Sequence, residues 1–292
     1  MSSLPRQKIN DYYDQFKSVD VTFTKEVIQI TGLVAKEIQL KCTSDFFPCV
    51  IYSTSFEAVK VVANNKSGLL HKLKSTNNVL SIRFFFKLRG TEEQVVFLVP
   101  ARVTGTSSYG SSPDMSLFTL VFSARPPDDL IEIMGCILEA NMNFTKRKDE
   151  RLTITPDAMR KMSLKAKDIF VVIDASTHRC VLREVFFSGA RLVMLDKTAP
   201  ENGKLVAIRL EFDDPREECI LSGKIVKFDT VTGNDDMYVI TVVYTDTVPM
   251  SYKVRLNNFL TSIKMDARIK TKTPDAGARG NGDKPPSLED TV

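Results

Sequence analysis

Residues 80–103 read LSIRFFFKLRGTEEQVVFLVPARV, and this stretch indicates the architecture of the chain. Large apolar side chains occupy every second position from Leu80 to Leu88, with mostly polar or basic residues between them. An apolar period of two is typical of a strand with one buried face. Residues 89–92 supply a turn into the next apolar run, 94–103, so we predict a β-hairpin.

Strand patterns continue on both sides of this hairpin. Further strand candidates lie at 19–32, 35–42, 47–53 and 117–123. Residues 104–114 are rich in serine and glycine and are predicted to be a loop. The first half of the chain is therefore expected to be a β-rich domain.

The apolar period changes to that of a helix after Pro127. One face of this helix collects Leu130, Ile133, Met134, Ile137 and Leu138. Residues 143–151, NFTKRKDER, then lack periodicity and are densely charged, which predicts an exposed connector between two domains.

Strand patterns return in the second half. Six short candidates lie at 169–173, 181–187, 190–195, 205–212, 219–228 and 237–244. Six strands favour a small barrel, and the spacing of Leu256, Phe259, Leu260 and Ile263 predicts one helix packed on it.

The fold class that follows is mainly β, with two small β-barrel domains and a few helices. The expected boundaries are 1–143 for the N-terminal β-rich domain, 144–151 for the linker, 152–264 for a C-terminal six-stranded barrel and 265–292 for a disordered tail.

The bulk composition is that of an ordinary globular protein. Of its 292 residues, 43% are hydrophobic and 26% are charged, and the net charge is +4. No run reaches the roughly 18 apolar residues of a membrane-spanning helix, and the start of the chain lacks an export signal. We therefore expect a cytoplasmic protein without membrane insertion.

The residue inventory also argues against catalysis. His71 and His178 are the only histidines, and neither stands beside a nucleophile or metal-ligand pattern. The five cysteines form no CxxC pair, so we predict reduced, mostly buried thiols. No enzyme activity, catalytic residue, metal or cofactor is expected.

Basic residues gather at the predicted domain junction. Lys146, Arg147, Lys148 and Arg151 lie within six residues, which favours an anionic partner. The planar fork of arginine suits phosphate, and it also suits the O6 and N7 atoms of guanine. The spacing RxxxR is a weak motif by itself, because Arg179 and Arg183 repeat it in a predicted strand.

The context of the first pair carries more weight. It stands directly before the barrel pattern, and residues 184–192 follow with EVFFSGARL. Here the chain resembles the PilZ family, in which an RxxxR element enters a six-stranded barrel and a [DN]xSxxG element follows. The resemblance covers about residues 144–264, and the preceding domain is similar to the PilZN-like domains of two-domain PilZ proteins, including spirochaete ones.

The resemblance implies a ligand, cyclic di-GMP, and a set of residues that bind it. The set is Lys146, Arg147 and Arg151 from the linker, with Glu184, Phe186 and Gly189 from the barrel. Two positions depart from the family pattern, because Glu184 replaces Asp or Asn and Phe186 replaces Ser. Loss of the serine hydroxyl is expected to cost roughly 1 to 3 kcal/mol of binding. Phe186 is expected either to stack on a base or to pack into the core.

The leading functional hypothesis is a signalling receptor in which cyclic di-GMP bridges linker and barrel and changes the orientation of the domains. The sequence does not distinguish whether such a receptor would regulate motility, adhesion or transcription. A downstream protein partner is expected, but the sequence does not identify it. One alternative is a degenerate PilZ-like interaction module that binds no nucleotide. RNA or DNA binding by the basic segment is disfavoured but would give steep salt dependence.

Overall fold

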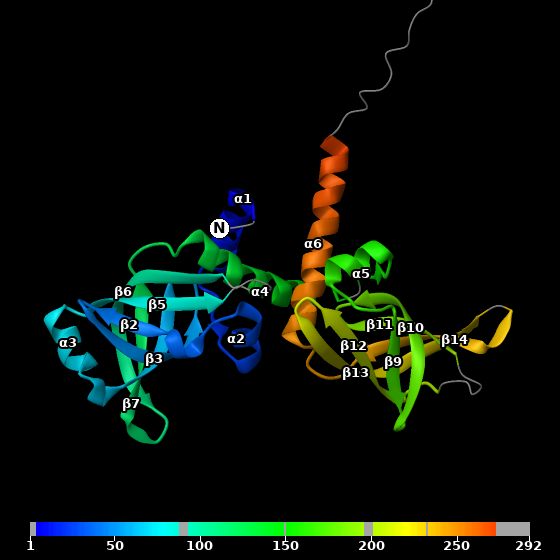
Figure 1. The fold of residues 1–292 in the computed structure, drawn as a ribbon, viewed down its shortest axis with the longest axis horizontal. Coiled ribbons are helices and arrows are strands. Elements are labelled where there is room, and N and C mark those ends of the chain that lie inside the picture. The colour runs from blue at the N-terminus through cyan, green and yellow to red at the C-terminus, as the bar shows by residue number, and fades with distance from the viewer. Residues whose placement is uncertain (1–3, 88–92, 149, 196–200, 232, 273–292) are drawn as a thin grey trace, which may run out of the picture.

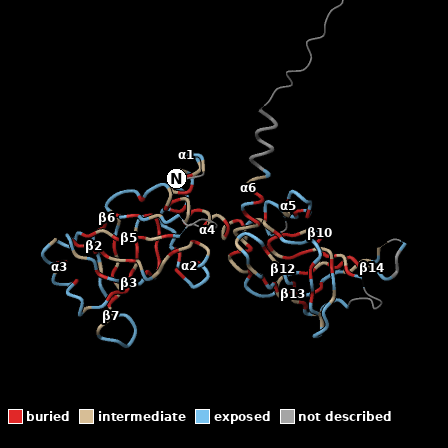
Figure 2. The backbone as a smooth tube through the Cα atoms, in the orientation of Figure 1, coloured by how far each residue is buried: buried red, intermediate tan, exposed pale blue. Residues whose placement is uncertain are grey.

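The computed structural model describes residues 4–87, 93–148, 150–195, 201–231 and 233–272. It consists of two closed, six-stranded β-barrels with helices between them (Figure 1). Buried residues run along the strands of both barrels, so each barrel has its own core (Figure 2). The predicted fold class is confirmed.

The first barrel is antiparallel throughout. Its strands are β1 (Val21–Thr22), β2 (Gln39–Cys42), β3 (Asp45–Thr54), β4 (Ala58–Asn64), β5 (Val79–Lys87), β6 (Gln94–Tyr109) and β7 (Ser112–Phe122). The order β3-β2-β5-β6-β7-β4 closes through β3–β4 pairing, and β1 adds to β3. The predicted hairpin is β5–β6, in which Phe84 lies opposite Phe97.

The prediction of one strand over 19–32 was wrong. Only β1 is extended, and α2 (Lys25–Thr31) follows. The Thr24 hydroxyl accepts a hydrogen bond from the Val27 amide at 3.3 Å, which caps the helix. Gly32, with φ of 72°, ends it in the left-handed region.

Two other local predictions needed correction. Residues 35–42 begin with the 3-10 helix η1 (Ala35–Glu37) before β2 starts. Residues 104–114 are mostly the ends of β6 and β7, which turn at Gly110 with φ of 64°. This end of the hairpin is largely exposed on both faces, so it carries no apolar alternation.

Some elements of the first half had no counterpart in the sequence predictions. They are α1 (Arg6–Phe16), strand β4, the 3-10 helix η2 (Asn65–Ser67) and α3 (Leu69–Ser75). Helix α1 buries Ile9, Tyr12 and Phe16, and it packs against α4.

The second barrel contains all six predicted strands. They are β9 (Asp168–Ile173), β10 (Ser176–Phe186), β11 (Gly189–Leu195), β12 (Leu205–Asp213), β13 (Arg216–Val231) and β14 (Asn234–Tyr244). The order β11-β14-β13-β12-β9-β10 closes through β10–β11 pairing. The short β8 (Leu152–Thr153) adds to β10, and α5 (Pro156–Met162) follows it.

Two long helices join the barrels. Helix α4 (Asp128–Lys146) confirms the helix predicted after Pro127, and α6 (Met250–Lys272) confirms the one predicted around Leu256. Both extend further than expected. Residues 143–146, predicted as exposed connector, are helical, and Asn143 is buried. Residues 265–272, predicted as tail, continue α6, whereas 273–292 lie outside the described residues.

A polar network connects α1 and α4 of the first domain to α6. The Glu139 carboxylate on α4 accepts hydrogen bonds from the Tyr12 hydroxyl at 2.9 Å and from Asn257 Nδ2 at 3.1 Å. It also accepts one from Lys8. Asn257 Oδ1 in turn accepts from Asn143 Nδ2 at 2.5 Å. The two asparagines are buried, so these bonds fix how α4 and α6 meet.

Glu139 should make the stability of the protein dependent on pH. Burial by itself raises the pKa of this carboxyl, but the hydrogen bonds from Lys8, Asn257 and Tyr12 outweigh burial, and the pKa lies below its usual range. The stabilisation is therefore complete above the unfolded pKa of about 4.3, and it is lost as pH falls through the folded pKa.

We expect Glu139→Gln to lower the free energy of unfolding by about 1 to 3 kcal/mol at pH 7, measured by urea denaturation. The difference from the unsubstituted protein should shrink as the pH falls below about 4.3. Glu57→Gln, at an exposed carboxylate, is the matched control. A difference that stays constant down to pH 3 would contradict this role for Glu139.

Candidate functional site

The basic linker starts with a turn at the end of α4. The Arg147 amide donates to the Asn143 carbonyl at 2.8 Å, and the Glu150 amide donates to the Arg147 carbonyl at 3.2 Å. The guanidinium of Arg147 lies 3.7 Å from the Glu150 carboxylate, so it forms an ion pair within the linker. Asp149 lies outside the described residues.

The linker is held on the barrel at the turn between β10 and β11. The Lys148 carbonyl accepts two hydrogen bonds from Ser188, one from Oγ at 2.8 Å and one from the amide at 3.2 Å. Two bonds from one residue fix this carbonyl firmly. The segment that carries Arg147 and Arg151 therefore runs along the residues 184–189 that the sequence selected.

Glu184 lies between two arginines beside this turn. One carboxylate oxygen is 3.7 Å from Arg151 Nη1, and the other is 3.8 Å from Arg191 Nη1. Glu184 follows a register shift in β10, and a shift of this kind re-aims the side chain next to it. The Glu184 side chain is only 17% exposed, so the cluster is largely shielded from bulk water.

Both ion pairs are too long for hydrogen bonds. Glu184 Oε2 and Arg191 Nε are buried, and neither forms a hydrogen bond within the part of the chain that the structure describes. Buried polar atoms usually have partners, so these two atoms are available to a ligand or to water. This cluster can therefore accept and donate further hydrogen bonds.

Phe186 lies beneath the linker. It is 4% exposed, and the Arg151 guanidinium carbon stands 5.3 Å from its ring centroid. Of the two expectations for Phe186, packing describes the observed position, because the ring is covered. A cation over an aromatic ring is attracted by it, so Phe186 helps to orient Arg151.

Gly189 is required by close packing. Its backbone lies outside the positive-φ region, so the glycine is not needed for a left-handed turn. A Cβ at this position would overlap the Val242 carbonyl oxygen of β14 and the ring of Phe186. The glycine lets β11 approach β14 and leaves room for the buried phenylalanine.

The structure thus brings together some of the predicted residues and leaves others apart. Arg151, Glu184, Phe186 and Gly189 form one cluster. Arg147 pairs inside the linker, and Lys146 is exposed at the end of α4.

Sequence reasoning included Ser188 in the span 184–189 without giving it a role of its own, and it did not name Arg191 as a binding residue. A signal for Arg191 was present, because a two-residue turn at 187–188 pairs Phe186 with Gly189 and so puts Arg191 opposite Glu184. The contact of Ser188 with Lys148 is between residues 40 apart and left no local signal.

The described residues contain no group of three or more His, Cys, Asp or Glu that could hold a metal ion. Within the same ranges, no helix has the length and apolar character needed to span a membrane. The five cysteines form no disulfide, and Cys42, Cys49, Cys180 and Cys219 are buried as predicted, whereas Cys136 is half-buried.

Comparison with known proteins identifies the family. Residues 7–141 match the PilZN3 domain. A protein of Treponema denticola described as "Cyclic di-GMP binding protein" is 37% identical over 270 residues, which cover 91% of this chain and 86% of the relative. The chain belongs to the spirochaete PilZ-type family. The resemblance drawn from the residues around Arg147 and Gly189 is confirmed at this level.

Two solved structures are also similar to this chain. The Borreliella burgdorferi PlzA protein in complex with c-di-GMP is 19% identical, with 87% of this chain and 98% of that chain covered and a TM-score of 0.40. YcgR of Escherichia coli in complex with c-di-GMP is 12% identical, with coverages of 89% and 97% and a TM-score of 0.29.

The packing role of Gly189 in this PilZ-type protein can be tested with one methyl group. We expect Gly189→Ala to lower the free energy of unfolding by about 1 to 3 kcal/mol, because the β11–β14 backbone contact or the Phe186 ring must shift. Thermal and urea denaturation measure this effect.

Gly105→Ala in β6 is the matched control. A Cβ there would meet the Thr119 side chain at an ordinary 3.7 Å, so the change should stay within about 0.5 kcal/mol. Equal effects at the two strand glycines would refute the packing explanation for Gly189.

Proposed function

We propose that this protein is a cyclic di-GMP receptor, with the ligand bound between the linker 144–151 and the β10–β11 turn. The observation that carries the proposal is Glu184, whose half-buried carboxylate lies between Arg151 and Arg191 without hydrogen bonds to either. The description of the Treponema denticola relative as a cyclic di-GMP binding protein supports the same ligand.

The cluster has the chemistry that a guanine base needs. A carboxylate accepts hydrogen bonds from guanine N1 and N2, as Glu184 would. An arginine can donate to O6 and N7 or stack flat on the base. Arg151 is accessible to a base, because its guanidinium carbon lies 5.3 Å from the Phe186 ring centroid and its side chain is 53% exposed.

The phosphates of the ligand require cations, and the linker provides them. Among the described residues, the Arg147 guanidinium pairs with Glu150, whose side chain is 39% exposed, so this pair can exchange for a phosphate at little cost. Lys146 is exposed one residue earlier and adds positive charge.

Ligand binding would also act on the orientation of the domains. The linker leaves α4 at Lys146, and α4 is bonded to α6 through Asn143 and Asn257. Tyr252 of α6 donates to the Phe186 carbonyl at 3.4 Å, so α6 touches the candidate site directly. A ligand that contacts the docked linker and the barrel together would favour one angle between α4 and α6 over others.

A second function is favoured by one observation. The family serine is replaced by Phe186, whose ring is buried and supplies no hydroxyl. If the loss of this hydroxyl abolishes nucleotide binding, the barrel acts as an interaction module for another protein. Titration with nucleotide decides between the two functions.

The test is calorimetric titration of the full chain with cyclic di-GMP, with cyclic di-AMP as the ligand control. We expect saturable binding that weakens about tenfold or more in Arg151→Ala and in Glu184→Gln, because each change removes a charge-assisted contact. Arg179→Ala is the matched control, since Arg179 begins the second RxxxR and is exposed and paired with Asp168.

Small-angle scattering with and without ligand measures the orientation of the domains. A profile that is unchanged at saturating ligand would refute the reorientation while leaving binding intact. Undiminished affinity in both Arg151→Ala and Glu184→Gln would refute the proposed site, and lack of binding at high micromolar ligand would favour the interaction module.

A further inference from the structure

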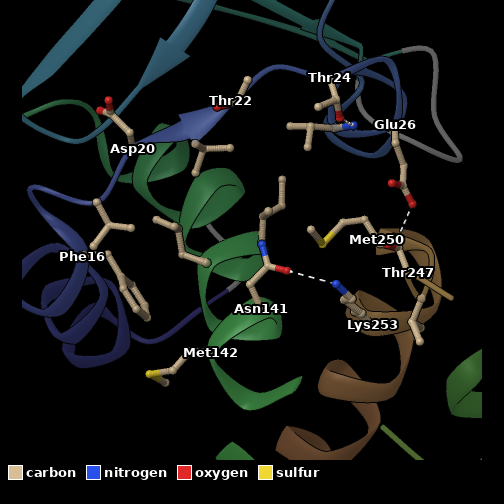
Figure 3. A pocket seen from close by; sticks show the side chains of 16 residues that line it. Phe16, Asp20, Thr22, Thr24, Glu26, Asn141, Met142, Thr247, Met250 and Lys253 are labelled. Carbon is tan, nitrogen blue, oxygen red and sulfur yellow. Dashed lines mark hydrogen bonds between the residues drawn. The ribbon is translucent and has the colours of Figure 1, made fainter. Parts of the chain in front are cut away.

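A cavity of about 630 Å³ lies at the junction of the two domains, away from the Glu184 cluster. Its walls come from the β1–α2 region, from α4, and from the start of α6 with the segment before it (Figure 3). This volume falls within the range of small-molecule sites in proteins. Cavities between domains are also a frequent place for ligands.

The walls of this junction cavity are mainly apolar. The contributing side chains include Phe16, Val27, Ile137, Leu138, Val248 and Met250. They come from elements far apart in the sequence, so the cavity exists only when the two domains are together. An apolar surface of this kind favours a ligand with a hydrocarbon body.

One cation points into the cavity. Lys253, on the first turns of α6, places its Nζ 3.5 Å from the Asn141 amide oxygen (Figure 3). The same Nζ lies 4.3 Å from the Phe144 ring centroid. Burial lowers the pKa of Lys253, and the nearby Glu26 carboxylate opposes this effect only in part. The ammonium group is thus partly desolvated, with one weak hydrogen bond to a neutral acceptor.

The two carboxylates that line the cavity are already engaged. Glu26 accepts a hydrogen bond from the Met250 amide at the start of α6, and Asp20 pairs with Lys60 at 2.7 Å. Within the described ranges, no carboxylate forms an ion pair with Lys253. A bound carboxylate would therefore meet one incompletely paired cation, while the two native carboxylates keep their own partners.

We propose that the junction cavity binds a single-chain aliphatic carboxylate, with its head group on Lys253 and its chain along the apolar walls. Charge complementarity selects an anion, and the apolar walls select a hydrocarbon body. A nucleotide does not fit this chemistry, because the cavity offers one lysine and no arginine. The site goes beyond the proposed cyclic di-GMP site and does not depend on it.

The test uses laurate as the probe, below its critical micelle concentration, titrated into the full chain at neutral pH. We expect saturable binding that weakens about tenfold or more in Lys253→Met, which keeps the apolar stem and removes the charge. Lys167→Met, at an exposed lysine of the second domain, should bind as the unsubstituted protein does. Dodecanol, which has the chain without the charge, should bind the unsubstituted protein more weakly than laurate.

A second variant tests the location. Thr247 is exposed at the edge of the cavity, so Thr247→Trp should fill the cavity and abolish laurate binding without unfolding the protein, which circular dichroism checks. Equal laurate affinity in the unsubstituted protein and Lys253→Met would overturn the proposal. So would unaltered binding in a folded Thr247→Trp, or no saturable binding to the unsubstituted protein.

Discussion

The hydrogen bond between Asn143 and Asn257 determines how the two halves of this protein meet. Each barrel is closed and has its own apolar core, so neither needs the other to complete its sheet. The contact between domains depends on α4 and α6, and its centre is a buried pair of amides bonded to Glu139. A buried amide without a partner costs about 1 to 3 kcal/mol, so the pair favours one arrangement of the helices over any that separates them.

This arrangement places both candidate sites around the same two helices. The linker leaves α4 close to Asn143, and α6 reaches the strand of Phe186 through Tyr252. On the other side of α4, Asn141 and Lys253 belong to the junction cavity. Ligands at either site would therefore act on the same helix pair. Thermodynamic linkage requires any such effect to be mutual, so each ligand would change the affinity for the other by the same factor.

The sequence predicted elements well where the burial of one strand face produced an alternating pattern. The β5–β6 hairpin and the six strands of the second barrel follow that rule. The strand prediction was wrong over 19–32. Alternating apolar residues at Val19, Val21 and Phe23 suggested one long strand there, but a short helix begins directly after them. A cap at Thr24 and a stop at Gly32 were the available signals, but the helix has only seven residues and few turns to show a period.

For the candidate site, the sequence predicted which residues take part, and the structure showed which of them contact one another. The basic run and residues 184–189 stand out in the sequence, and turn geometry alone pairs Glu184 with Arg191. The distance from Arg151 to Glu184 depends on how the linker docks at Ser188, which no local pattern encodes. The sequence alone showed that Phe186 replaces the serine of the family motif and so removes a hydroxyl. The position of the Phe186 ring next to Arg151 could be seen only in the structure.

The cap on α6 has a consequence for folding. The first-turn amide of Met250 donates to Glu26, a residue of α2 in the other domain, so α6 is not fully capped until both domains are in place. A chain cut between the barrels would lose this cap, and a cut after Asn143 would also separate Asn143 from Asn257. The junction that holds the two barrels together is therefore built from residues of both domains, and neither domain supplies it alone.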